Sequence, residues 1–153
     1  KEESIINIWH KMEVIQLIGF RPNEDNPIKM TLFEMSVAAG YPIPVESGIE
    51  KEVDLNEFLV EHPASTFFAR VEGLNMIHAG IRDGDILVVD SSVEPSEGKI
   101  VLATLNNGLT IKIYREVNGE IFLESQKQQF LPLSVGEIEF NIIGTVTKII
   151  HSL

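Results

Sequence analysis

The sequence predicts a mainly β protein, in which an extended, partly helical N-terminal arm precedes a rolled, antiparallel β domain. After residue 63, six strand-like segments follow one another with short turns between them. Two of these turns, at 106–108 and 118–119, contain Asn-Gly, which accepts the positive φ angles that tight hairpins require. The first 50 residues lack this pattern, so the chain divides near residue 50.

The N-terminal part is predicted to be irregular. Residues 3–20 place apolar side chains at a helix-like spacing, although residues 12–18 fit a strand equally well. Residues 21–30 contain two prolines and several turn formers, which is typical of a loop. A short helix is expected over 31–39. Residues 40–44 are then expected to be extended, because each of the two prolines there disfavours a helical conformation in the residue before it.

The second part begins after a flexible connection at 47–48. Residues 54–62 are predicted to form a brief helix that ends at Pro63. Asp54 is expected at its N-cap and Glu57 at the capping-box position three residues later. The strands that follow are expected over 66–71, 85–90, 99–105, 109–115, 120–124 and 139–151.

Charge and composition exclude several classes of function. The chain carries 12 Lys and Arg against 23 Asp and Glu, a net charge of −11, so duplex DNA binding is not expected as its main task. Cysteine is absent, which excludes disulfides, thiolate zinc sites and cysteine nucleophiles. No apolar run reaches the roughly 18 residues that a membrane span needs. We therefore expect a cytoplasmic protein without a membrane partner.

Common catalytic and metal-binding motifs are also missing. The sequence has no Gly-rich phosphate loop and no Gly-x-Ser-x-Gly elbow. The four histidines lie far apart and are interpreted as isolated surface or partly buried side chains. The stretch 82–85 lacks the spacing of a calcium loop, and a turn before a strand is the better interpretation. We expect neither a metal nor a cofactor.

Three motifs nevertheless keep a fixed order after residue 70. They are Val-Glu-Gly-Leu-Asn-Met at 71–76, Gly-Ile-Arg-Asp-Gly-Asp-Ile-Leu-Val-Val-Asp at 80–90, and Leu-Thr-Ile-Lys at 109–112, with Gly-Lys-Ile-Val at 98–101 between the last two. Together they resemble the core of the LexA/UmuD self-cleaving peptidases, over residues 36–150. The resemblance implies a LexA-type peptidase β domain.

In that family a serine in Gly-x-Ser-Met is the nucleophile, a lysine in Thr-Val-Lys is the general base, and an upstream Ala-Gly or Cys-Gly bond is cleaved. The resemblance implies that Asn75 occupies the nucleophile position, that Lys112 is the general base and that Ala39–Gly40 is the cleaved bond. The separations, 112 − 75 = 37 and 75 − 39 = 36 residues, are similar to those of the UmuD branch. The residues that support the motif are Gly73, Met76, Gly84 and Asp85.

Asn75 departs from the family pattern. A side-chain amide cannot form the acyl intermediate that serine forms, so the chain as written is predicted not to cleave itself. Asn75 is either an introduced or a natural change, and its alternative role is that of a helix N-cap. A lysine acts as a base only in its neutral form, and burial among apolar neighbours favours that form. The alternative to a general base at position 112 is a solvent-facing lysine on a strand. The alternative for Gly40 is the end of a helix.

The resemblance implies an arm, residues 1–39, removed on self-cleavage, and a peptidase and dimerisation domain, residues 40–153. A UmuD-like SOS-response protein would be a homodimer that is cleaved under the influence of the RecA–DNA filament. It would then serve an error-prone translesion DNA polymerase through a UmuC-like subunit. An arm of 39 residues is shorter than a winged helix-turn-helix domain and linker need. The alternatives are the C-terminal domain of a LexA- or phage-type repressor and a non-catalytic interaction module.

Overall fold

A computed structural model describes residues 15–18, 27–33, 39–42, 50–74, 76–105, 108–124 and 140–153. The chain forms two compact units. One unit comprises residues 22–61, and the other comprises residues 1–21 together with residues 62–153.

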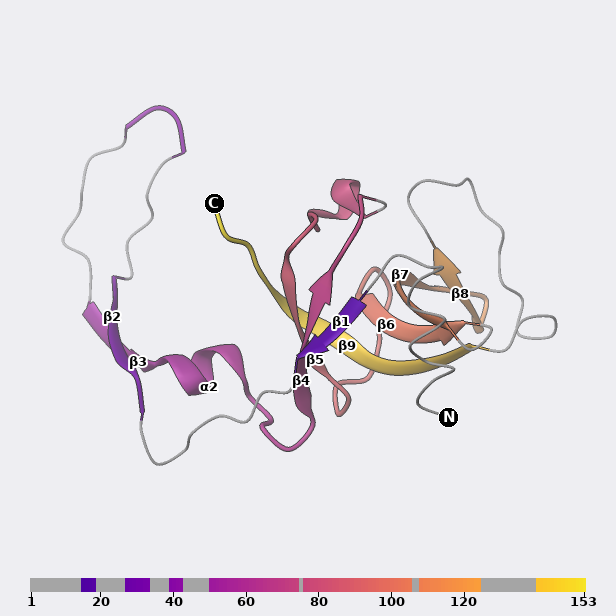
Figure 1. Cartoon of the computed structure of the whole chain (residues 1–153), viewed down its shortest axis with the longest axis horizontal. Coiled ribbons are helices and arrows are strands. Elements are labelled where there is room, and N and C mark those ends of the chain that lie inside the picture. Colours follow the sequence, from indigo (N-terminus) through magenta and orange to yellow (C-terminus); the bar gives the residue numbers. More distant parts are fainter. Residues whose placement is uncertain are drawn as a thin grey trace. The chain divides into compact units, whose positions relative to one another are not determined.

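The larger unit is a seven-stranded antiparallel sheet (Figure 1). Its strand order is β1-β4-β5-β9-β6-β7-β8. The mainly β prediction is thus confirmed, and each of the six expected strands is present within two residues of its expected ends. The strands are β1 (Ile15–Ile18), β4 (Thr66–Val71), β5 (Ile86–Asp90), β6 (Ile100–Leu105), β7 (Gly108–Val117), β8 (Glu120–Glu124) and β9 (Phe140–Ile150).

Strand β9 joins the two halves of this sheet. Its C-terminal part pairs with β5 and its N-terminal part pairs with β6, so that Thr145 lies opposite Asp90 on one side and Val101 on the other. The main hydrophobic core combines side chains of both halves: Ala69, Val71, Leu87 and Val89 from β4 and β5, and Leu102, Ile111 and Ile113 from β6 and β7. Because one face of each half lines the same core, the sheet is rolled, as the sequence predicted.

A close approach of strands explains one glycine of β9. A Cβ atom on Gly144 would lie 2.7 Å from Cγ1 of Val89 and 3.1 Å from the backbone oxygen of Asp90. The pairing register also shifts on both sides of this part of β9, between Val88 and Val89 and between Leu102 and Ala103. Gly144 therefore allows β9 to pass close to β5 where the sheet is irregular.

The hairpin between β7 and β8 turns as the sequence predicted. Asn118 has φ 52° and Gly119 has φ 80°, the left-handed values that a tight hairpin turn needs at both central residues. The other predicted hairpin joins β6 and β7, where Leu105 lies opposite Gly108. Its central residues, 106 and 107, lie outside the described residues.

In its described residues, the smaller unit contains a two-stranded antiparallel sheet and the helix α2. Strand β2 (Lys29–Phe33) pairs with β3 (Glu50–Asp54), and α2 (Leu55–Leu59) follows β3 directly. Asp54 is the N-cap as predicted, since its Oδ1 accepts a hydrogen bond of 2.9 Å from the backbone N–H of Asn56. The helix ends at Leu59 rather than at residue 62, because Val60 has an extended backbone.

Two predictions for the N-terminal half need correction, and one strand there was missed. The helix expected over 31–39 is wrong at 31–33, and the loop expected over 21–30 is wrong at 29–30, because these residues form β2. Strand β3, whose sequence Glu-Lys-Glu-Val-Asp lacks a hydrophobic alternation, was not predicted, and the flexible connection expected at 47–48 lies outside the described residues. Pairing between the two strands overrides the local pattern here. Of the ambiguous segment 12–18, residues 15–18 form a strand; the helix expected before them and residues 34–38 lie outside the described residues.

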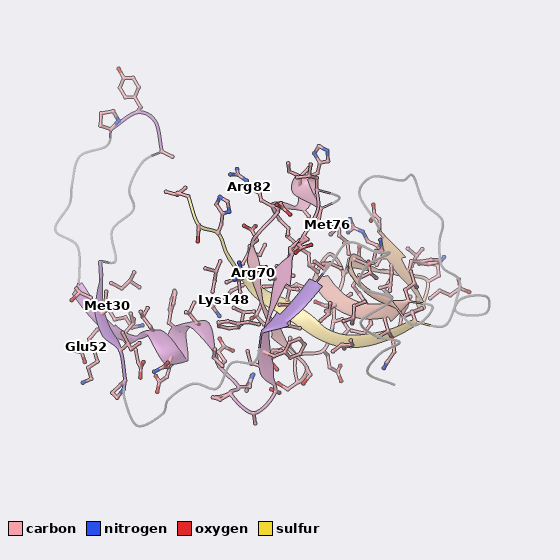
Figure 2. The ribbon with its side chains drawn as sticks, viewed as in Figure 1. Met30, Glu52, Arg70, Met76, Arg82 and Lys148 are labelled. Carbon is pink, nitrogen blue, oxygen red and sulfur yellow. The ribbon has the colours of Figure 1, made fainter. Side chains whose placement is uncertain are left out.

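The smaller unit buries little apolar surface of its own. Val60 is its one buried hydrophobic residue among those described, whereas Ile28, Met30, Leu32 and Phe58 are all at least 42% exposed. Figure 2 shows Met30 and Glu52 on the two strands. A two-stranded hairpin with so small a core is marginally stable by itself in water.

In the part of the chain that the structure describes, no helix is long and apolar enough to cross a lipid bilayer.

Candidate active site

The loop between β4 and β5, residues 72–85, carries the predicted nucleophile position. It contains a short 3-10 helix over Ile77–Ala79, and three of its glycines (Gly73, Gly80 and Gly84) have positive φ angles. Asn75 itself lies outside the described residues. The 3-10 helix has Met76 as its N-cap, and the interpretation of Asn75 as a helix N-cap stays a prediction.

The side chain of Met76 packs the 72–85 loop against the main hydrophobic core. Its side chain is only 5% exposed and belongs to the same hydrophobic cluster as Ile111 and Ile113 of β7 (Figure 2 labels Met76). These two isoleucines flank Lys112. The first and third sequence motifs, which are separated by more than 30 residues in the chain, therefore meet in one packed cluster.

Lys112 lies in the middle of β7 and is half-buried. It stands opposite Val101 of β6, on the face of the strand that also carries Tyr114. Val101 and Tyr114 belong to a second hydrophobic cluster, whereas Ile111 and Ile113 face the main core. Because side chains alternate along a strand, the two isoleucines point away from the lysine. Lys112 thus extends from a strand whose neighbouring side chains are mostly apolar.

Two aspartates of the Gly-Asp motif hold the loop in shape. Asp83 Oδ1 accepts a hydrogen bond of 2.8 Å from the Gly73 N–H, and Asp85 Oδ2 accepts one of 2.8 Å from the Arg82 N–H. Two backbone bonds close the base of the loop: Val71 N–H to Asp85 O at 2.9 Å, and Gly84 N–H to Val71 O at 2.7 Å. The predicted turn before β5 is therefore confirmed, and the motif residues Gly73, Gly84 and Asp85 have structural roles on both sides of position 75.

The predicted cleavage bond lies in the smaller unit. Ala39 and Gly40 form a bend between β2 and β3, and both residues are exposed. Gly40 has φ 120°, a value that L-residues rarely adopt, and a Cβ atom added there would meet nothing within 4 Å. An exposed bend of small residues is a segment that a narrow peptidase cleft can admit.

Sequence reasoning missed two histidine–aspartate pairs. His62 Nδ1 lies 2.6 Å from Asp90 Oδ2, and His151 Nδ1 lies 2.6 Å from Asp85 Oδ1. Both carboxyl groups are almost completely buried, whereas both histidines are partly exposed. The histidines are far from their partners in sequence, so no local spacing could indicate these pairs. Among the described residues, no three His, Asp or Glu side chains are placed to hold a metal ion.

The carboxylate of Asp90, at the end of β5, accepts several hydrogen bonds. Burial alone would raise its pKa, but the Ser92 and Ser65 hydroxyls, the Ser92 N–H and His62 all bond to it. These bonds outweigh burial and lower the pKa of Asp90 from 3.8 to about 2. The cluster fixes the end of β5 against residues 62–65, where the larger unit begins after the smaller one.

The lowered pKa of Asp90 predicts an acid-sensitive contribution to stability. The folded state binds this proton less tightly than the unfolded state, so the contribution is complete above about pH 4 and disappears as the pH falls toward 2. It amounts to about 2 kcal/mol. Urea unfolding at pH 5 and pH 2.5 should show that Asp90→Asn removes this part of the pH dependence, whereas Glu120→Gln, at an exposed carboxylate, should not. An unchanged dependence in Asp90→Asn would contradict the assignment.

Comparison with known proteins agrees with this architecture. The family described as peptidase S24-like matches residues 31–147, which include the 72–85 loop and β7. Protein ImpA of Salmonella typhimurium is 35% identical over 131 residues, which are 85% of this chain and 89% of ImpA. Protein MucA of Escherichia coli is 43% identical over 76 residues, half of each chain (50% and 52%). The LexA repressor of Colwellia psychrerythraea is 36% identical over 118 residues, 76% of this chain and 56% of the repressor.

The rolled sheet, the braced loop and the lysine-bearing strand thus define a peptidase-type β domain. The family match covers more than half of the chain and spans all three motifs. The chain belongs to the peptidase S24-like family, and the resemblance to LexA/UmuD-type peptidases is confirmed.

Proposed function

We propose that this chain is a UmuD-like SOS-response protein built for self-cleavage at Ala39–Gly40 by a Ser–Lys dyad, and that it is inactive as written because Asn75 replaces the serine. One observation carries the proposal: Met76, next to position 75, packs in the same cluster as the two isoleucines that flank Lys112. This packing supports the proposal, because it brings the residue next to position 75 to the cluster that β7, the strand with Lys112, also lines. The family match supports a serine peptidase ancestry.

The chemistry follows from a serine at position 75. Its hydroxyl oxygen would attack the carbonyl carbon of Ala39 while the neutral Nζ of Lys112 takes the hydroxyl proton. The C–N bond to Gly40 would then break as the lysine returns that proton to the leaving amine. Water hydrolyses the remaining acyl ester. Asn75 cannot begin this sequence, because the lone pair of an amide nitrogen is delocalised.

The partners belong to the same proposal. We infer a homodimer that responds to a RecA–DNA filament and serves a UmuC-like translesion polymerase, in the cytoplasm. The matches to ImpA and MucA support this assignment, and the match to the LexA repressor keeps the C-terminal domain of a repressor as the alternative. A second candidate is a non-catalytic interaction module, which Asn75 itself favours.

Replacement of Asn75 by serine tests the proposed reaction. The Asn75→Ser chain, incubated at pH about 9–10, should yield a fragment that begins at Gly40, because the lysine base must lose its proton. Mass spectrometry of the intact mixture identifies this fragment, and the unaltered chain is the control. The reaction should be slower at pH 7. If no fragment beginning at Gly40 forms at either pH, the dyad proposal is wrong.

A further inference from the structure

The C-terminal end of β9 is bonded to the loop that carries position 75. His151 directly follows β9, and its Nδ1 lies 2.6 Å from Oδ1 of Asp85. The other oxygen of the same carboxylate accepts the Arg82 N–H at 2.8 Å. The Asp85 side chain is only 1% exposed, and a buried carboxylate is costly unless its oxygens are hydrogen-bonded. The His151 side chain and the backbone N–H of Arg82 therefore bond to the same carboxylate, that of Asp85.

A third bond closes this arrangement. Arg82 Nη1 lies 3.3 Å from Nε2 of His151. A guanidinium group can only donate, so Nε2 must accept, and Nδ1 then carries the hydrogen that is donated to Asp85. One imidazole ring consequently connects the backbone of the loop, the Arg82 side chain and the end of β9. Figure 2 shows Arg82 at this loop, near the C-terminal tail.

Strand β9 is separated from the lysine strand β7 by β6 alone. Thr145 of β9 lies opposite Val101 of β6, and Val101 lies opposite Lys112 of β7. One continuous strand is thus anchored to the nucleophile loop at its end and to the neighbour of the lysine strand in its middle. A shift of the loop relative to β9 would change the distance between position 75 and Lys112.

We propose that His151 and Asp85 form a positioning pair, which holds the 72–85 loop at the distance from Lys112 that self-cleavage needs. Neither side chain takes part in the bond-making step. This inference rests on the proposed self-cleavage for its catalytic part, while the ordering of the loop by His151 is independent of it.

The first experiment uses the chain with Asn75 in place. Hydrogen exchange of the loop amides, measured by mass spectrometry of peptides covering 77–84, should become about tenfold faster in His151→Ala. His151→Asn should restore most of the protection, since its side-chain amide can still donate to Asp85. Ser152→Ala, at the exposed next residue, is the control. Amides of β6 and β7 report global opening: equal acceleration there, or no acceleration in the loop, would overturn the proposal.

The second experiment measures the rate of self-cleavage in the Asn75→Ser chain. His151→Ala should lower this rate by about 10- to 100-fold at a temperature where the chain remains folded, because small misplacements of reacting groups have effects of this size. His151→Asn should recover most of the rate, and Ser152→Ala should leave it unchanged. An unchanged rate in His151→Ala would refute the catalytic part. If Asn75→Ser alone does not cleave, the proposed function has failed instead, and the exchange result still decides whether His151 orders the loop.

Discussion

Lys112→Ala in the Asn75→Ser chain is expected to slow self-cleavage by about 100- to 10 000-fold, the usual contribution of a general base. The lysine lies on a strand among mostly apolar neighbours, and its strand also carries Ile111 and Ile113, which belong to the same hydrophobic cluster as Met76. Loss of the amine would leave the serine hydroxyl without an acceptor for its proton. The measurement is the rate at which the Gly40 fragment appears at pH 9–10.

Two further variants test whether the rate depends on the basic amine of Lys112 or only on a positive charge. Lys112→Arg keeps the positive charge, but a guanidinium group does not deprotonate in this pH range, so it should be as inactive as Lys112→Ala. Lys148→Ala removes a half-buried strand lysine of β9 instead and should leave the rate near that of Asn75→Ser alone. Cleavage that persists in Lys112→Ala would remove this residue from its proposed role. Circular dichroism checks that each variant is folded.

Leu102→Ala is expected to lower the free energy of unfolding by about 2–5 kcal/mol, as deletion of a buried leucine side chain commonly does. Leu102 is fully buried in β6, with β7 on one side and β9 on the other. Its side chain belongs to the core cluster that both halves of the sheet line, so the cavity would open where they meet. Urea unfolding followed by circular dichroism measures the change.

The matched control is Leu74→Ala, the same chemical change at a leucine that is 56% exposed. Surface substitutions of this kind usually change stability by less than about 0.5 kcal/mol. A loss in Leu102→Ala no larger than in Leu74→Ala would mean that the centre of the sheet is not packed as described.

The β domain was predictable because its signals are local. Strands β4 to β9 read as apolar runs or alternations bounded by turn formers, and the Asn118–Gly119 turn has the φ angles that its two residue types favour. The N-cap at Asp54 is local in the same sense, since it bonds two residues ahead. The role of Lys112 was predicted only from the resemblance to LexA/UmuD peptidases. Residue patterns alone would have predicted a surface side chain at this position.

The features that escaped prediction depend on contacts between distant segments. Strand β3 is a charged sequence that is extended because β2 pairs with it. Gly144 is required by Val89 and the Asp90 backbone, more than 50 residues away in the chain. The two histidine–aspartate pairs join residues that are 28 and 66 positions apart. No spacing rule within one element could have indicated them.

The position of Ala39–Gly40 between β2 and β3 has a consequence for the products of the proposed reaction. The bend that would be cut is the covalent link of the hairpin, so β2 would leave with residues 1–39 while β3 stays with the remainder. Five residue pairs between β2 and β3, and four between β1 and β4, would then join two separate molecules rather than parts of one chain. Cleavage removes the effective local concentration that the intact connection between β2 and β3 provides, so at ordinary cellular dilution the fragment would diffuse away. Recombination would be rare, and the cut would act as a one-way step.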